Sequence, residues 1–296
     1  MRIGQLFHLT PLVDDLDAAV AFYDAVFGPL CTYRGYSSHW HRDAAILVMA
    51  DTVVEPMQPY PPADGEQGTS WFRYIDRFGP RVHNMAFYVE GRSELARRLH
   101  DAGVRTTDGG VGANVFTYPK QTPGMLEFFE PGEYRANDPR LSPHWPALRD
   151  HYWPHIHPLG LVRLSHLTVV VADRVGAARF YADVLDAVAL PEQEATVPGA
   201  TSSFVLVGED TILELAQPVD AACPIAADLE AVGDCVTGAT FTVRDLGAAA
   251  RHLAMADAPV ASQGDDRIEL DRARTWNLAH TFTEAVLVGD PRADRG

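Results

Sequence analysis

The sequence has 296 residues, of which 47% are apolar and 22% are charged, and its formal net charge is −16. This length suits two domains, because a domain of about 150 residues is large enough to bury its own core. The composition excludes a disordered or fibrous protein, and the excess of acidic side chains argues against nucleic acid or anionic lipid as a partner.

No stretch approaches the ~18 consecutive apolar residues of a membrane span, and the opening MRIGQLFHLT lacks the layout of a secretory signal. We therefore expect a cytoplasmic protein with no membrane partner. The three cysteines are too few and too scattered for a disulfide framework. We expect Cys31, Cys223 and Cys235 to be buried free thiols.

The first predicted element is a short strand at residues 8–13, which is apolar and rich in β-forming side chains. The aspartates that follow can cap a helix, and Gly28 can end it. Apolar side chains recur along this helix every three or four residues, at Leu16, Ala19, Tyr23 and Val26. Strand-like runs at 45–49 and 52–57 complete a unit that reads as βαβββ.

The same order of elements returns from residue 83, with a strand at 83–89, a helix near 93–102 and strand-like runs around 115–118 and 125–129. The segment after it, 131–158, lacks a strong period and contains Pro139, Pro143, Pro146 and Pro154. Such a segment predicts a mostly irregular connection.

The chain also repeats itself over a longer distance. The residues His8-Leu9-Thr10, Asp15, Phe22-Tyr23 and Val26 return 158 positions later as His166-Leu167-Thr168, Asp173, Phe180-Tyr181 and Val184. Residues 51–59 return in the same way at 210–218, 159 positions later. Two matched blocks in the same order predict that the halves are duplicated domains.

A fourth unit begins near 239–243, and its last strand falls in the run 278–288. We therefore expect four units, two in each half. The predicted boundaries are an N-terminal domain at 1–135, a linker at 136–160 and a C-terminal domain at 161–296.

This pattern resembles the vicinal-oxygen-chelate (VOC) superfamily, which includes glyoxalase I, methylmalonyl-CoA epimerase, extradiol dioxygenases and bleomycin-resistance proteins. The resemblance covers nearly the whole chain. It implies an α+β fold in which four βαβββ modules pair into two VOC domains, each a curved sheet around a cup. It also implies a metal site in the cup, held by the first and last strands of each unit.

The N-terminal half has a suitable side chain at each of the four positions that the resemblance implies, namely His8, Glu55, His83 and Glu127. Imidazole and carboxylate suit a divalent ion such as Fe2+, Ni2+, Co2+, Mn2+ or Zn2+. Glu127 also lies in an apolar run, where an unpaired buried carboxylate would be costly. A single histidine at the start of a strand is more often structural, so the expectation rests on the four residues together.

The C-terminal half departs from this pattern. His166 and Glu214 repeat the first pair, but Thr237 or Gly238 stands where the second histidine belongs. On the last strand either His280 or Thr281 takes the ligand position, with Glu284 as a further candidate. We expect a degenerate site in this half.

The resemblance implies a small-molecule substrate with adjacent oxygens and an isomerase, epimerase or lyase reaction of the glyoxalase I type through an enediolate-like intermediate. Glu127 or Glu55 would act as the catalytic base. One alternative is an Fe(II) ring-cleaving dioxygenase. Another is a metal-free protein that sequesters an antibiotic or similar ligand. A duplicated chain can pair its own units, so we expect a monomer or a homodimer.

Aromatic residues ahead of the second unit leave two interpretations open. Trp71, Phe72 and Tyr74 either line a pocket or cap the core.

Overall fold

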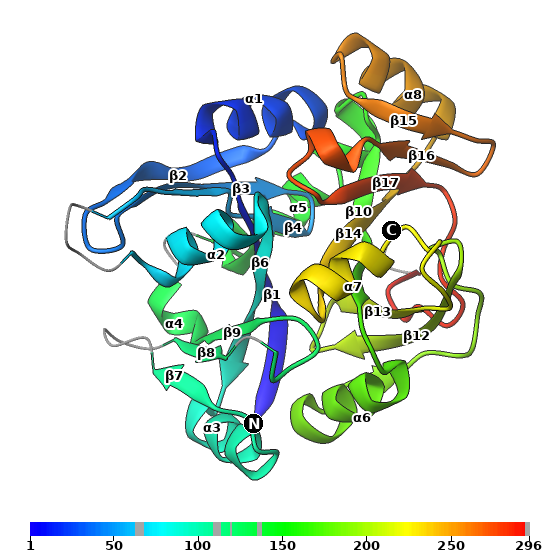
Figure 1. Cartoon of the computed structure of the whole chain (residues 1–296). Helices are drawn as coiled ribbons and strands as arrows, with labels where there is room; N and C mark the ends of the chain where they lie inside the picture. The colour runs from blue at the N-terminus through cyan, green and yellow to red at the C-terminus, as the bar shows by residue number, and fades with distance from the viewer. Residues whose placement is uncertain (63–67, 109–113, 119, 135–137, 294–296) are drawn as a thin grey trace.

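The computed structural model describes residues 1–62, 68–108, 114–118, 120–134 and 138–293. Two mixed β-sheets stand side by side, one built by each half of the chain, with helices against them (Figure 1). The predicted α+β class, with two sheets that correspond to two VOC domains, is confirmed. Among the described residues no helix is long and apolar enough to cross a membrane.

The first sheet has the strand order β2-β3-β4-β1-β6-β9-β8-β7, and β5 pairs with β1 and β3. Its first unit comprises β1 (Arg2–Leu12), α1 (Leu16–Phe27), β2 (Leu30–Ser37), β3 (Arg42–Met49), β4 (Thr52–Val54) and β5 (Met57–Pro59). After α2 (Ser70–Phe78), the second unit comprises β6 (Arg81–Glu90), α3 (Arg92–Asp101), β7 (Thr106–Asp108), β8 (Val115–Thr117) and β9 (Leu126–Phe129).

Local sequence explains where α1 begins and ends. The side chain of Asp15 accepts a hydrogen bond from the Ala18 amide at the start of the helix. Gly28 ends it with a φ of 53°, a left-handed conformation that glycine adopts without strain. The predicted helix at this position is therefore correct at both ends.

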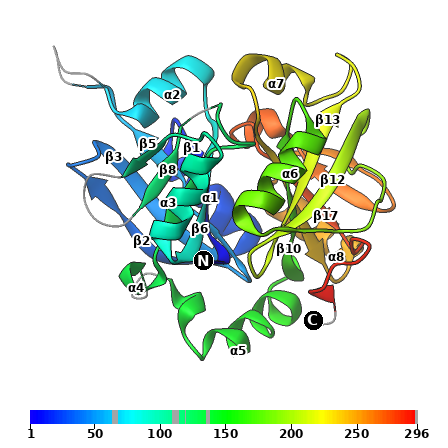
Figure 2. The ribbon, with the colours of Figure 1, turned by 90° about the horizontal axis from the view of Figure 1, so that it is seen from below.

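The connection between the sheets is more helical than its prolines suggest. It contains α4 (Pro131–Tyr134), a 3₁₀ turn at Pro139–Leu141, α5 (Trp145–Arg149) and a π turn at Tyr152–Ile156. In the view of Figure 2, α5 lies at the lower edge of the picture, below the strands of both halves. Two buried tryptophans hold this segment to the first half, because the Trp145 indole donates to Ala50 O at 3.0 Å and the Trp153 indole donates to Phe27 O at 3.1 Å.

The second sheet has the order β11-β12-β13-β10-β14-β17-β16-β15, which parallels that of the first. Its third unit comprises β10 (Leu161–Val170), α6 (Arg174–Leu185), β11 (Val188–Ala189), β12 (Ala200–Val207) and β13 (Thr211–Pro218). After α7 (Ala226–Val232), the fourth unit comprises β14 (Cys235–Val243), α8 (Leu246–Met255), β15 (Val260–Gln263), β16 (Arg267–Leu270), a 3₁₀ turn at Arg272–Arg274 and β17 (Ala279–Thr283).

One continuous apolar cluster joins residues of both sheets and of helices α1, α3, α6 and α8. Within it, Tyr23 of α1 contacts His280 of β17, with its hydroxyl 3.3 Å from His280 Nε2. Tyr181 of α6 donates in the opposite direction to Pro123 O. The first helix of each half therefore packs against the other half.

The expectation for the cysteines is wrong at one position. Cys223 and Cys235 are buried, as expected, but Cys31 is exposed. Cys31 lies on β2, at the edge of the first sheet, where few side chains cover it.

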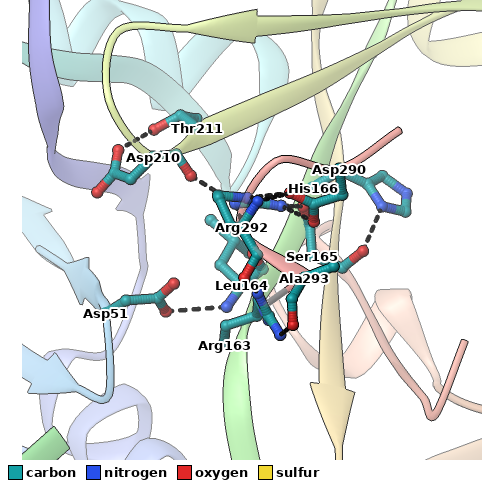
Figure 3. A network of polar contacts seen from close by, with 10 residues as sticks. All are labelled: Asp51, Arg163, Leu164, Ser165, His166, Asp210, Thr211, Asp290, Arg292 and Ala293. Carbon is teal, nitrogen blue, oxygen red and sulfur yellow. Dashed lines mark hydrogen bonds and ion pairs between the residues drawn. The ribbon is translucent and has the colours of Figure 1, made fainter. Parts of the chain in front are cut away.

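A further repeat, which the sequence analysis missed, secures both halves. In the sequence Asp138-Pro139-Arg140 and Asp290-Pro291-Arg292, each arginine is buried and bonds to the aspartate two residues before it. Arg140 also donates to Phe7 O at 2.9 Å and Asp51 O at 2.8 Å. Arg292 donates to the carbonyl groups of Leu164, Ser165 and Asp210, as Figure 3 shows.

Candidate metal centre

The pairing of β1, β6 and β9 aligns two of the candidate ligands in one row across the first sheet. His8 of β1 lies opposite Ala86 of β6, and Ala86 lies opposite Glu127 of β9. Their neighbours Leu9, Met85 and Phe128 belong to the apolar cluster on the other face. The row His8–Ala86–Glu127 therefore faces away from that cluster, because side chains alternate between the two faces of a sheet.

A bulge brings His83 into the same site. Thr10 pairs with Asn84, but the next residue of β1, Pro11, pairs with Val82, so β6 has one additional residue at His83. A bulge of this kind redirects a side chain. Here it leaves His83 beside Asn84 instead of on the opposite face.

Glu55 reaches the site from the end of β4, where its amide donates to Leu9 O at 2.8 Å. Its Oε2 lies 3.2 Å from His8 Nδ1, and Thr10 Oγ1 lies 2.9 Å from the same nitrogen. The other carboxylate oxygen, Oε1, accepts a hydrogen bond from Arg42 Nη1 at 3.3 Å. Glu55 therefore links His8 to Arg42.

His83 and Glu127 are joined through Asn84. His83 Nδ1 lies 2.8 Å from the amide oxygen of Asn84, which can only accept, so Nδ1 carries the proton and Nε2 keeps its lone pair. The amide nitrogen of Asn84 donates to Glu127 Oε2 at 2.8 Å, and Asn114 donates to Oε1 at the same distance. A hydrogen bond of this kind on Nδ1 is typical of metal-binding histidines, because it orients the ring.

Burial sets the protonation of the site. It lowers the pKa of His83 to about 4, against the opposing effect of the Asn84 bond, and it lowers the pKa of His8 below its ordinary value. Burial raises the pKa of Glu127 to about 8, an effect that the Asn114 bond opposes and the charge of Glu55 increases. Both imidazoles are thus neutral at pH 7, the form that binds metals.

The residue types fit a divalent ion, and a cation would relieve the cost of two buried carboxylates. In their present arrangement the four side chains form two hydrogen-bonded groups, His8–Glu55 and His83–Asn84–Glu127. Within the described part of the chain, no three His, Cys, Asp or Glu side chains already surround one point as a metal cluster. Side-chain rearrangement would be needed to bring the two groups into one ligand shell.

Three further residues of this site were missed by the sequence analysis, namely Arg42, Asn84 and Asn114. Of these three, only Asn84 could have been found from the sequence, because it is adjacent to His83. Trp71 and Tyr74 supply a wall of the cup: the ring centre of His83 lies 6.4 Å from that of Trp71 and 4.9 Å from that of Tyr74. Trp71 and Tyr74 also belong to a buried apolar cluster that includes Leu12 and Met57, so they cap the core as well as adjoin the site.

Strand pairing settles which residues occupy the equivalent positions of the second half. His166 lies opposite Thr240, and Thr240 lies opposite Thr281, which makes Thr281 the counterpart of Glu127. A bulge between Val236 and Gly238 makes Thr237 the counterpart of His83. His280 points instead into the apolar cluster, where its ring stacks on Phe241.

Glu214 is fully engaged by protein donors. Its Oε1 accepts from the Thr196 amide at 2.7 Å and from Ser202 Oγ at 2.8 Å, and its Oε2 accepts from the hydroxyls of Thr168 and Thr196. Burial alone would raise the pKa of Glu214, but the bonds from His166, Thr196 and Ser202 together with the charge of His166 hold it at about 2. The cup of this half is a cavity of about 460 Å³, with Thr168, Thr237, Thr240 and Thr281 among its lining residues.

Two solved structures have a fold that aligns with nearly the whole of this chain. A mutant of 4-hydroxymandelate synthase from Streptomyces coelicolor is 16% identical, with a TM-score of 0.65 over 97% of this chain and 94% of that one. A xylose isomerase-like TIM barrel/4-hydroxyphenylpyruvate dioxygenase fusion protein is 12% identical, with a TM-score of 0.62 over 99% of this chain and 51% of that one. At these identities the likeness establishes the fold alone.

A search of curated proteins found no match. A family model described as a glyoxalase-like domain matches residues 6–185, more than half of the chain. That stretch contains the whole candidate metal centre and the first strand and helix of the second half. The chain therefore belongs to the glyoxalase-like domain family, within the vicinal-oxygen-chelate superfamily.

Proposed function

We propose that this protein is a divalent-metal enzyme whose N-terminal cup acts on the adjacent oxygens of a small substrate, in an isomerase, epimerase or lyase reaction. The observation that carries the proposal is that four buried side chains of the ligand type, His8, Glu55, His83 and Glu127, form two hydrogen-bonded groups on neighbouring strands, with both imidazoles neutral. The equivalent cup of the second half has threonines in place of two of these four residues.

His8, His83 and Glu127 would hold the ion, with Glu55 as a fourth ligand or as a base. A bound Fe2+, Ni2+, Co2+, Mn2+ or Zn2+ ion supplies Lewis acidity, which polarises the substrate's oxygens and stabilises negative charge on them. Asn84 fixes His83 and Glu127 relative to each other, because it bonds to both side chains. Such positioning keeps the donor atoms directed into the cup.

The two carboxylates are held differently, and this suggests different roles. Both oxygens of Glu127 accept hydrogen bonds of 2.8 Å from asparagine amides, so Glu127 is fixed in place. The contacts of Glu55 are longer, 3.3 Å to Arg42 Nη1 and 3.2 Å to His8 Nδ1. We therefore assign the proton transfer at the substrate carbon to Glu55, since it is the freer of the two, and a permanent ligand role to Glu127.

A second candidate function is favoured by the same contacts of Glu55. If Glu55 stays with Arg42 and His8, the remaining donors are two histidines and one carboxylate, the set typical of non-haem Fe(II) oxygenases. Two structural neighbours that align with 97% and 99% of this chain are named as 4-hydroxymandelate synthase and a 4-hydroxyphenylpyruvate dioxygenase fusion protein. In this case the protein would be an Fe(II) dioxygenase with its site in the N-terminal half.

Two assays on the purified full-length protein separate these functions. Isomerase chemistry predicts metal-dependent exchange of carbon-bound hydrogen for deuterium in dihydroxyacetone or pyruvate, followed by NMR, and loss of that exchange in the Glu55→Gln variant. Dioxygenase chemistry predicts Fe2+-dependent oxygen uptake with catechol, which Glu55→Gln retains. If neither activity appears and no ion binds, the enzyme proposal is wrong and a ligand-sequestering role is favoured.

A further inference from the structure

Arg42, the first residue of β3, places a fixed positive charge beside the candidate metal ligands. Its Nη1 lies 3.3 Å from Glu55 Oε1, and its Cζ lies 5.0 Å from the centre of the Trp71 ring. Although burial is the main influence on the pKa values of His8, His83 and Glu127, the charge of Arg42 lowers all three. The guanidinium is therefore within electrostatic reach of each of these side chains.

Two buried N–H groups on this wall of the cup have no acceptor. Arg42 Nε and Trp71 Nε1 are both inaccessible to solvent, and neither has a hydrogen-bond partner among the described residues. A buried donor left in this state costs about 1–3 kcal/mol, and such groups in a folded protein call for an explanation. The guanidinium lies over the indole ring, so the two groups are close together, and a ligand with acceptor oxygens beside them is one such explanation.

The duplication offers an internal comparison. Arg42 pairs with Pro59 across β3 and β5, and the corresponding pair in the second half is Ala200 with Pro218. That half also has Thr237 and Thr281 in place of two candidate ligands. An arginine thus occupies this position in the half with four candidate ligands, whereas an alanine occupies the equivalent position of the other half.

Charge balance indicates what the arginine would bind. Arg42 is a cation in a mostly buried position, and the carboxylate that it contacts at 3.3 Å, Glu55, is itself a candidate ligand or base. That contact uses Nη1, and Nε, which has no partner among the described residues, is left for a second acceptor. A planar guanidinium matches a carboxylate with two parallel hydrogen bonds.

We propose that Arg42, with the indole N–H of Trp71 beside it, binds a carboxylate group of the substrate. The substrate is then a small carboxylic acid whose neighbouring oxygens reach the candidate ion. This inference rests on the proposed metal centre and narrows its substrate class. Arg42 acts as a specificity-determining residue that selects an anionic substrate over a neutral one.

Calorimetric titration of the Co2+-loaded full-length protein with two probes tests this inference. Oxalate offers neighbouring oxygens together with carboxylate charge, whereas catechol offers neighbouring oxygens without a carboxylate. We expect Arg42→Gln to weaken oxalate binding by about tenfold to a hundredfold and to leave catechol binding within about threefold. The matched control is Arg267→Gln, which removes an arginine that lines the second cup and should change neither affinity.

The visible absorption of bound Co2+ reports metal loading separately from probe binding. If Arg42→Gln retains Co2+ and its affinity for oxalate is unchanged, the proposed role of Arg42 is wrong, although the metal centre would stand. The same holds if the affinities for oxalate and catechol fall equally. Failure of the wild-type protein to take up Co2+ would overturn the metal centre itself, and this inference with it. If Arg42→Gln does not hold Co2+, the comparison moves to Arg42→Lys, for which we expect a smaller loss confined to oxalate.

Discussion

Asp51 and Asp210 lie in equivalent turns of the two halves, and each accepts a hydrogen bond from the first strand of the other half. Asp51 Oδ1 is 2.9 Å from the amide of Leu164 in β10, and Asp210 Oδ1 is 3.0 Å from the amide of Leu6 in β1 (the first of these contacts is drawn in Figure 3). This reciprocal exchange ties the halves together in one orientation. The candidate metal centre is therefore carried by a scaffold to which both halves contribute.

Removal of either carboxylate should loosen this attachment. We expect Asp51→Ala and Asp210→Ala each to lower the free energy of unfolding by about 1–3 kcal/mol, because each leaves a buried amide without its acceptor. Urea denaturation followed by circular dichroism measures the change. The control is Asp265→Ala, at an exposed position, which should stay within about 0.5 kcal/mol of the wild type. Equal effects in all three variants would contradict the exchange as a stabilising contact.

The buried arginines of the repeated Asp-Pro-Arg sequence should be more sensitive. Arg140→Ala leaves the Asp138 carboxylate buried without its ion pair and removes one donor from each of two carbonyl groups. We expect a loss of about 3–5 kcal/mol in the free energy of unfolding, and a similar loss for Arg292→Ala. Arg149→Ala, at a half-exposed ion pair, serves as control and should cost less than about 1 kcal/mol. A loss at Arg140 as small as that at Arg149 would be inconsistent with this interpretation.

His280 predicts how stability depends on pH. Burial lowers its pKa to about 4, whereas an unfolded histidine titrates near its ordinary value of about 6.5. Between these values the unfolded chain binds a proton that the folded one does not, so stability falls as the pH drops from 6.5 towards 4. The size of this effect is about 3 kcal/mol for the full shift.

The variant His280→Phe keeps an aromatic ring against Phe241 and removes the titration. Its free energy of unfolding should therefore fall less steeply than that of the wild type between pH 7 and pH 4, in urea denaturation at a series of pH values. Replacement of the exposed His100 by alanine should leave the slope unchanged. Parallel curves for His280→Phe and the wild type would show that His280 does not titrate in this way.

The second cup should behave as a structural site. With its pKa held at about 2, Glu214 stabilises the fold above pH 4.5 and loses this contribution as the pH falls from about 4.5 to 2. Glu214→Gln should lower the free energy of unfolding at pH 7 by roughly 1–3 kcal/mol, since its donors lose a charged acceptor. The Glu214→Gln variant should bind as much metal as the wild type, as measured by elemental mass spectrometry. A drop in bound metal in this variant would argue for a site in the second half.

The sequence predicted the fold well because the signals for it are local or repeated. The aspartate before α1, the glycine after it and the echo of His8 at His166 are visible in one chain. The candidate ligands could also be located, since each lies at a strand position that the repeat identifies. That these four residues bind a metal is a prediction, which metal analysis of the purified protein tests.

Other features of the site depend on which strand residues pair with one another, and one sequence alone does not show this. The bulge at His83, which turns that side chain towards Asn84, follows from the register of β1 with β6. Register also decides between His280 and Thr281 as the counterpart of Glu127. Arg42 could not be found in advance, because its contact with Glu55 depends on how β3 lies beside the end of β4.

The metal content of the purified protein tests the central claim most directly. We expect close to one divalent ion per chain in the wild type and in His166→Ala, and less than about 0.2 in His83→Ala, because loss of one of a few ligands weakens a site severely. Circular dichroism confirms that each variant is folded. An ion-free wild type that takes up no added Fe2+, Ni2+, Co2+, Mn2+ or Zn2+, or a His83→Ala variant with an undiminished ion, would contradict the account.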